Sequence, residues 1–245
     1  MVADLIGDQT TIDDVLATMR AIDRRLPDGD GVKWFNFLYL EVTETLAADR
    51  GGWQDWPFLQ QFDVVFARLY FDAIVSWERQ PAATAHAWRP LFRARHDTRL
   101  ARIQFALAGM NAHINHDLPV ALRRLAEADG RYPSRDGARY GDFSRVNDVL
   151  ERVEGSVAAV LATGLLGEIE QALGDLDNVI AMWKVRNARE AAWTNGEVLW
   201  HLRSTPLLGR EFLARLDSTT GFASRGLLLP TLGVGAGPGG GGVRR

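Results

Sequence analysis

The spacing of the apolar residues is the feature that most restricts the fold of this chain. Along most of the sequence these residues recur at intervals of three and four, whereas alternation of apolar and polar residues over five or more positions is rare. Intervals of three and four place side chains on one face of an α-helix, and alternation would place them on one face of a strand. The sequence therefore predicts an all-α protein, a compact bundle of about eight or nine helices.

Prolines, glycines and capping residues set the expected ends of these helices. The expected helices cover residues 12–26, 32–48, 57–78, a segment from 82 that Pro90 kinks or restarts, 98–112, 118–128, 143–162, 166–202 and 206–216. Neither half of the chain looks self-sufficient in composition, so we expect one all-α domain over residues 1–225. Residues 226–245 are expected to form a flexible tail, because the glycines that fill it from Gly233 onward cannot bury apolar surface.

Composition and charge exclude several classes of function. The chain carries 28 Lys and Arg against 31 Asp and Glu, interleaved along the sequence, so no basic surface for nucleic acid is expected. No apolar run approaches the roughly 20 residues of a membrane span, and the first residues lack the pattern of a secretory signal, which predicts a cytoplasmic protein without membrane contact. The sequence has no cysteine, which excludes a thiol nucleophile and a thiolate metal site.

One polar cluster interrupts the apolar helices. It reads Asn-Ala-His-Ile-Asn-His-Asp-Leu-Pro and covers residues 111–119. On a helix His113 and Asp117 share one face, whereas Asn111 and Asn115 point to nearly the opposite side. A carboxylate four residues after a histidine fixes the tautomer of a general base, or joins the histidine as a ligand of a divalent cation. The cluster is therefore the first candidate for a functional site.

A complete site needs a further group from another helix, as in the sites that helical bundles build from facing side chains. Glu41 and Glu44 are the strongest candidates for a carboxylate that opposes His113, and Asp72 and His201 are further ones.

The same cluster also fits a purely structural role. Asp117 and Pro119 are typical of the N-cap and first turn of a helix, which predicts that the cluster is a junction between two helices. The asparagines would then satisfy backbone groups at the junction, and the histidines would be buried and hydrogen-bonded. His113 is the residue that capping explains least.

A second candidate region lies toward the C-terminal end of the chain. Arg186 and Arg189, which are three residues apart, and Trp193 are expected to line a pocket for an anionic or planar ligand. The alternative is that the tryptophan packs in the core while the arginines extend to solvent or pair with acidic residues.

Three stretches give the chain a resemblance to a known family. They are residues 106–119, which end in Met-Asn-Ala-His-Ile-Asn-His-Asp-Leu-Pro, the hexapeptide Asp-Phe-Ser-Arg-Val-Asn at residues 142–147, and the pattern Trp-x-x-Arg-x-x-Arg from Trp183 to Arg189. On these stretches the chain resembles an actinobacterial family catalogued only as a domain of unknown function, over most of residues 10–220. The resemblance implies an all-helical fold and brings no reaction. His116 is the position that the family pattern is least expected to fix.

The leading functional hypothesis is an enzyme of specialised metabolism that acts on a small organic molecule by hydrolysis, elimination or ring closure. His113 would act as the general base or as a ligand, Asp117 would orient it, and Asn111 or Asn115 would hydrogen-bond the substrate. No cofactor is expected, while a divalent metal and a homo-oligomer are left open. The alternatives are a non-catalytic protein that binds a small ligand, and a metal-dependent hydrolase.

Overall fold

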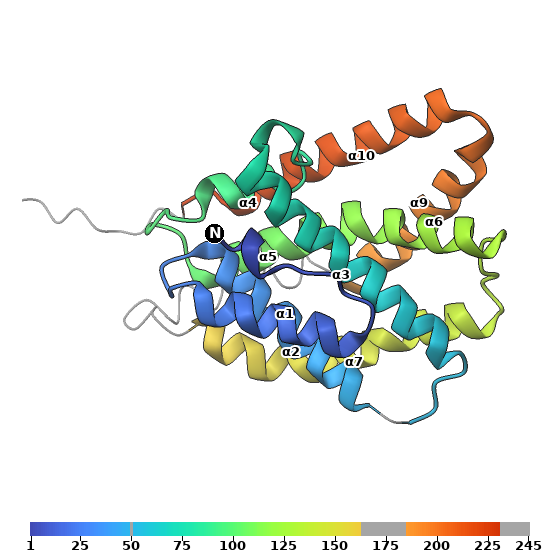
Figure 1. Cartoon of the computed structure of the whole chain (residues 1–245), viewed down its shortest axis with the longest axis horizontal. Helices are drawn as coiled ribbons and strands as arrows, with labels where there is room; N and C mark the ends of the chain where they lie inside the picture. The colour runs from blue at the N-terminus through green and yellow to red at the C-terminus, as the bar shows by residue number, and fades with distance from the viewer. Residues whose placement is uncertain (50, 163–184, 231–245) are drawn as a thin grey trace, which may run out of the picture.

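The computed structural model describes residues 1–49, 51–162 and 185–230. This part of the chain forms the predicted all-α bundle and contains no strand (Figure 1). Its α-helices are α1 (Ile12–Arg25), α2 (Gly31–Ala48), α3 (Trp56–Arg79), α4 (Arg89–Ala94), α5 (Arg102–Ala112), α6 (Leu118–Asp129), α7 (Ala138–Ala162), α9 (Val185–His201) and α10 (Pro206–Leu227). Short 3-10 turns lie at Ala3–Leu5, Pro81–Ala83 and Leu202–Ser204.

Local chemistry sets several helix ends where the sequence predicts them. The Thr11 side chain accepts a hydrogen bond from the N–H of Asp14, and the Asp14 carboxylate accepts one from the N–H of Thr11, which completes a capping box at the start of α1. Pro57 lies in the first turn of α3, and Pro90 restarts the chain in the first turn of α4. Gly130 ends α6 with a left-handed φ of 73°.

The predicted junction at the polar cluster is not a fresh helix start. α5 continues through a π-helical turn, His113–Asp117, directly into α6. Asp117 has helical backbone angles and makes no capping hydrogen bond with its side chain, so its predicted role as an N-cap is wrong. The N–H of Leu118 reaches back five residues to the carbonyl of His113. This wider turn gives room to Pro119, whose ring would clash with the preceding turn of a regular α-helix.

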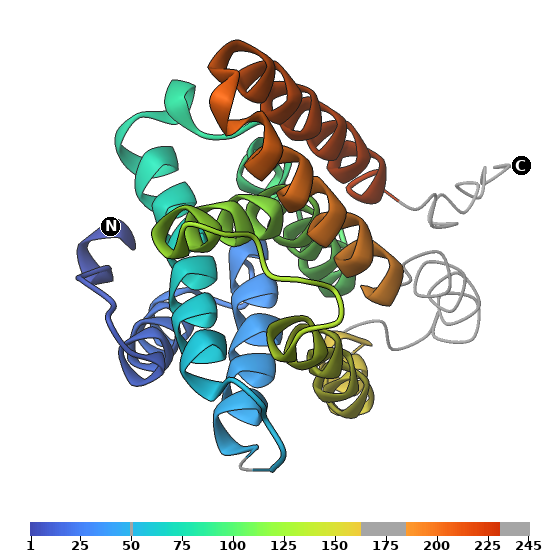
Figure 2. The ribbon, with the colours of Figure 1, turned by 90° about the vertical axis from the view of Figure 1, so that its right-hand side faces the viewer.

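The joined helices α5 and α6 run through the middle of the bundle. α2 contacts α1, α5 and α7, while α6 contacts α3 and α9, and α10 lies along α5 (Figure 2). The described residues share one hydrophobic core with side chains from α1 through α9. Trp88, Trp193 and Tyr70 are its largest fully buried members. The π-helical turn therefore lies against helices from both halves of the chain.

One helix end near the C-terminus differs from the prediction. α10 runs to Leu227 rather than to residue 216, so the first residues of the predicted tail belong to a helix and residues 231–245 lie outside the described part. The contact face of α10 is built from small residues, Gly209, Thr220, Gly221 and Ser224, which an apolar pattern does not reveal. The expected helix over residues 166–202 is described from Val185 onward, as α9.

Candidate functional site

A cavity lies between α2, α3, α5 with its π-helical turn, α7 and α9. Its volume is about 70 Å³. This exceeds the ~10–15 Å³ that one water molecule needs, and it is smaller than the ~150 Å³ cavity that admits benzene. Among the described residues, four polar side chains line the cavity: Tyr39, Asp63, His113 and Arg189. The rest of the wall is apolar: Phe35, Leu38, Val42, Leu46, Leu59, Phe62, Phe66, Met110, Ile114, Val146 and Leu150.

Each of the four polar side chains brings a buried polar atom without a hydrogen-bond partner among the described residues. These atoms are the hydroxyl oxygen of Tyr39, Oδ2 of Asp63, Nε2 of His113 and Nε of Arg189. Buried polar atoms in folded proteins nearly always have a partner, because leaving one without a hydrogen bond costs free energy. Four such atoms belong to side chains that line one small cavity, which makes it the candidate site.

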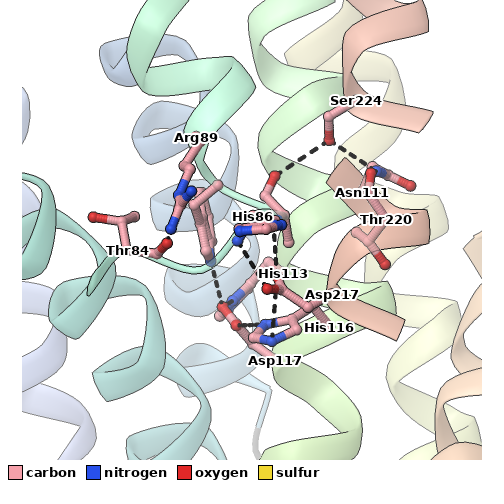
Figure 3. A network of polar contacts seen from close by, with 12 residues as sticks. Thr84, His86, Arg89, Asn111, His113, His116, Asp117, Asp217, Thr220 and Ser224 are labelled. Carbon is pink, nitrogen blue, oxygen red and sulfur yellow. Dashed lines mark hydrogen bonds and ion pairs between the residues drawn. The ribbon is translucent and has the colours of Figure 1, made fainter. Parts of the chain in front are cut away.

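His113 is held by the carboxylate of Asp117, as the spacing of the two residues predicts. The distance from His113 Nδ1 to Asp117 Oδ2 is 2.9 Å, and both side chains are buried (Figure 3). An ionised carboxylate accepts the proton of Nδ1, which leaves Nε2 as the unprotonated nitrogen. Burial lowers the pKa of His113, although Asp117 opposes this effect. The imidazole is therefore neutral near pH 7, with a basic Nε2 that has no partner among the described residues.

Aromatic rings fix the plane of His113. Its imidazole is stacked on Phe66, with ring centroids 3.6 Å apart and an interplanar angle of 8°. Tyr39 packs against the imidazole at a tilt, with the centroids 4.7 Å apart. Because these contacts and the bond to Asp117 hold the ring from different sides, Nε2 has a defined direction.

Asp117 is the centre of a polar network that continues away from the cavity (Figure 3). Its Oδ2 also accepts from Trp88 Nε1 at 3.0 Å, and its Oδ1 accepts from His116 Nδ1 at 2.7 Å. Nε2 of His116 lies 3.7 Å from Oδ1 of Asp217 on α10. Burial alone would raise the pKa of Asp117, but the hydrogen bonds from both histidines hold it below its usual range.

His116 takes part in this network although the resemblance gave it the lowest rank. Burial lowers its pKa, but the hydrogen bond to Asp117 and the nearby Asp217 outweigh that effect and raise it. His116 therefore favours the charged form more than His113 does, and its charge stabilises the Asp117 carboxylate. Asp217 is itself held by the backbone N–H groups of His86 and Ala87, at 2.9 and 2.8 Å.

Asp63 and Tyr39 are site residues that the sequence analysis missed. Burial raises the pKa of Asp63 to about 7, so its carboxyl keeps a proton well above the usual range. Burial also raises the pKa of Tyr39 well above 10, so its hydroxyl stays protonated. A signal for Asp63 was available, because it lies between Phe62 and Phe66 in a helix that is apolar on more than one side.

Glu41 and Glu44 do not supply the carboxylate that was predicted opposite His113. Both are on α2, but neither lines the cavity. Glu44 forms an ion pair with Arg20 at 2.7 Å, and both side chains are well exposed. Partial burial raises the pKa of Glu41, with Glu44 and Asp23 adding to the effect.

The predicted asparagines face α10 rather than the cavity. Asn111 donates to the carbonyl of Thr220 at 3.0 Å and to Oγ of Ser224 at 2.9 Å. Asn115 donates to Oδ1 of Asn111 at 2.9 Å. His113 and the asparagines therefore lie on different faces, as predicted, and the asparagine face anchors α10.

The residues of the second candidate region, Arg186, Arg189 and Trp193, also lie in different surroundings. Arg189 lines the cavity, whereas Arg186 is exposed and pairs with Glu151 at 2.9 Å. Trp193 is fully buried in the core, where it packs on Phe143 with ring centroids 4.7 Å apart. Trp183, the first residue of the tryptophan–arginine pattern, lies outside the described residues.

The described part of the chain contains no group of three His, Asp or Glu side chains that could hold a metal ion. None of its helices is both long enough and apolar enough to cross a membrane.

Comparison with known protein families gives a match over most of the chain. The model of a family described as a family of unknown function (DUF5995) matches residues 12–230. The match covers α1 to α10 and thus all the residues of the cavity. No curated protein and no solved structure matches the chain.

Proposed function

The chain belongs to the DUF5995 family, for which no function is described, and we propose from its cavity that it is an enzyme acting on a small organic molecule by acid–base catalysis. One observation carries the proposal. His113 lines an apolar cavity, and its Nε2 has no partner among the described residues, while Asp117 holds Nδ1 of the same ring. A purely structural histidine would have both nitrogens satisfied.

In the proposed reaction Nε2 of His113 removes a proton from the substrate. Asp117 keeps the imidazole in the required tautomer and stabilises the imidazolium that forms. Asp63 has a pKa of about 7, which suits a group that donates a proton near neutral pH. The Tyr39 hydroxyl, which is also without a partner in the described part, donates a hydrogen bond to the oxygen that gains negative charge.

The side chains that line the cavity favour some classes of reaction over others. Most of the lining side chains are apolar, and the volume is small. Elimination, in which a base removes a proton as a leaving group departs with its electron pair, and ring closure both proceed without water as a reactant, so both fit an apolar site. Hydrolysis remains within the proposal if one water molecule lies beside His113. A role in specialised metabolism and an actinobacterial source stay predictions.

A non-catalytic protein that binds a small ligand is the second candidate. The apolar wall and the buried Arg189 favour it as much as they favour an enzyme. The His113–Asp117 pair separates the two, because binding alone does not need an oriented base. A metal-dependent hydrolase has less support, since the described residues offer no group of ligands for a metal ion.

The test is a search for turnover by the purified full-length chain. It is incubated with a small-molecule extract of the source cells, and mass spectrometry follows every compound. Hydrolysis adds the mass of water, elimination removes a small molecule, and ring closure by isomerisation changes retention at constant mass. His113→Gln and Asp117→Asn are expected to lower the rate by about 100-fold or more. His96→Gln is the matched control, because His96 is exposed.

Two results would count against the proposed reaction. Conversion by His113→Gln at the rate of the unchanged chain would show that His113 is not the base. Compounds that bind in the cavity without being converted would favour the non-catalytic candidate.

A further inference from the structure

Arg189 is a buried cation without a counter-ion in the described part of the chain. Its side chain is 3% exposed and lines the cavity. It makes no ion pair within 4.0 Å in this part. Glu190, the next residue of α9, is instead hydrogen-bonded to Tyr140 at 2.7 Å and pairs with Arg135 at 3.2 Å. A buried charge without a partner is costly, and proteins normally pair it.

The guanidinium group is fixed in place before any ligand arrives. Nη2 donates to the carbonyl of Phe143 at 2.6 Å, and the guanidinium carbon lies 4.2 Å from the centroid of the Phe143 ring. Nε has no partner in the described part. A fixed guanidinium with an unused N–H loses little side-chain entropy when it binds an anion.

Up to about pH 7 the other described polar groups of the cavity do not fully neutralise this charge. His113 is neutral near pH 7, and Tyr39 stays protonated. Asp63 retains its proton up to a pKa of about 7 and forms no ion pair with Arg189. The described side chains of the cavity therefore carry a net positive charge up to about pH 7, and a single negative charge on a ligand would balance the charge of Arg189.

The walls select among anions. Arg189 is the only Lys or Arg among the described side chains that line the cavity, and most of the others are apolar. A phosphate group carries more charge and needs more donors than one arginine supplies. A carboxylate is planar, carries one charge and matches a guanidinium edge. An apolar body attached to it would fill the rest of the cavity.

We propose that the ligand of this cavity is a small monocarboxylic acid with an apolar body, whose carboxylate is held by Arg189. This assignment deepens the proposed function and rests on it for the chemistry, since it places the carboxylate on Arg189 and leaves His113 free to act on the body of the acid. The binding itself is separable from catalysis and can be measured without the true substrate.

Isothermal titration calorimetry on the full chain tests the assignment with butanoate, butanamide and inorganic phosphate at pH 7 and constant ionic strength. Butanamide has nearly the shape of butanoate without its charge. Butanoate is expected to bind at least about tenfold more tightly than butanamide or phosphate. Arg189→Met should remove this preference. Arg186→Met is the matched control, because Arg186 lies on the same helix but is exposed.

Each outcome has a defined meaning. Equal affinity for butanoate and butanamide in the unchanged chain overturns the assignment, and this comparison needs no variant that might fold poorly. Tighter binding of phosphate would also overturn it. His113→Gln should still bind butanoate. Loss of turnover in this variant with butanoate binding retained therefore distinguishes the proposed catalytic role of His113 from the proposed carboxylate site at Arg189.

Discussion

The polar side chains of the cavity lower the stability of the empty fold. Each of Tyr39, Asp63, His113 and Arg189 was removed from water and has a polar atom with no partner in the described part of the protein. Buried polar groups without partners are commonest at functional sites. A packed apolar side chain in the same place would stabilise the fold more. The residue that shows this most clearly is Asp63, because burial moves its pKa to about 7.

Asp63→Asn is expected to stabilise the fold at neutral pH. The ordinary pKa of 3.8 is raised to about 7 in the folded chain. Below pH 3.8 the carboxyl is protonated in both states and has no effect. As the pH rises from 3.8 to about 7, only the unfolded chain releases the proton, so the fold loses stability; above 7 the loss is constant. Between pH 5 and 7 the advantage of the variant should grow by roughly 2–3 kcal/mol.

Urea unfolding of both proteins at pH 5, 6, 7 and 8 measures this difference. Other titrating groups are common to both chains, so their effects largely cancel. Asp8→Asn is the control for the loss of a carboxylate, because Asp8 is exposed and does not line the cavity. A constant difference between Asp63→Asn and the unchanged chain would show that Asp63 ionises normally.

At the scale of single helices, sequence spacing predicts the contacts within a helix better than the contacts between helices. The pairing of His113 with Asp117 is a matter of helical geometry, so the sequence predicts it. Asp63 was missed because α3 is apolar around much of its surface, and only packing decides which side meets the cavity. Glu41 and Glu44 were chosen for their type, but α2 turns them away from His113.

The π-helical turn shows a second limit of sequence reasoning. Asp117 followed by Pro119 is typical of a helix start, so the local sequence favours an N-cap at Asp117. Three hydrogen bonds to the Asp117 carboxylate, from His113, His116 and Trp88, compete with capping. Trp88 belongs to a distant part of the chain, so this outcome depends on tertiary contacts.

α10 offers a test of how close packing holds one helix. A Cβ atom at Gly221 would overlap the backbone carbonyl of His86, whereas one at Gly226 would meet no atom. Gly221→Ala should therefore destabilise the fold by about 1–3 kcal/mol. Gly226→Ala, in the same helix, should be neutral or stabilise it by up to about 1 kcal/mol. Urea unfolding followed by tryptophan fluorescence measures both changes.

Gly221→Ala and Gly226→Ala also test the link between α10 and the polar network around Asp117. Asp217 of α10 holds the N–H groups of His86 and Ala87 and lies beside His116. A shift of α10 in Gly221→Ala should change the chemical shifts of His116 in NMR spectra, while Gly226→Ala should leave them unchanged. Equal stability of the two variants would mean that α10 is not closely packed at Gly221.

At the scale of the whole molecule, the bundle leaves a space between its helices that closer packing would fill. Folded interiors are normally dense, and a cavity of about 70 Å³ leaves its lining atoms without some of their contacts. The described helices share one core around it. A protein selected only for stability would be expected to close this space, so its presence fits a binding role.

Val146→Leu is expected to raise stability and to weaken ligand binding together. Val146 lines the cavity, so one added methylene extends into empty space and should raise the melting temperature by about 2–4 °C, equivalent to about 1 kcal/mol. Val149→Leu is the matched control on α7, because Val149 is 1% exposed and does not line the cavity. There the added methylene should overpack the core and lower the melting temperature. Butanoate affinity should fall in Val146→Leu and persist in Val149→Leu, and the opposite order would mean that the cavity is not the binding site.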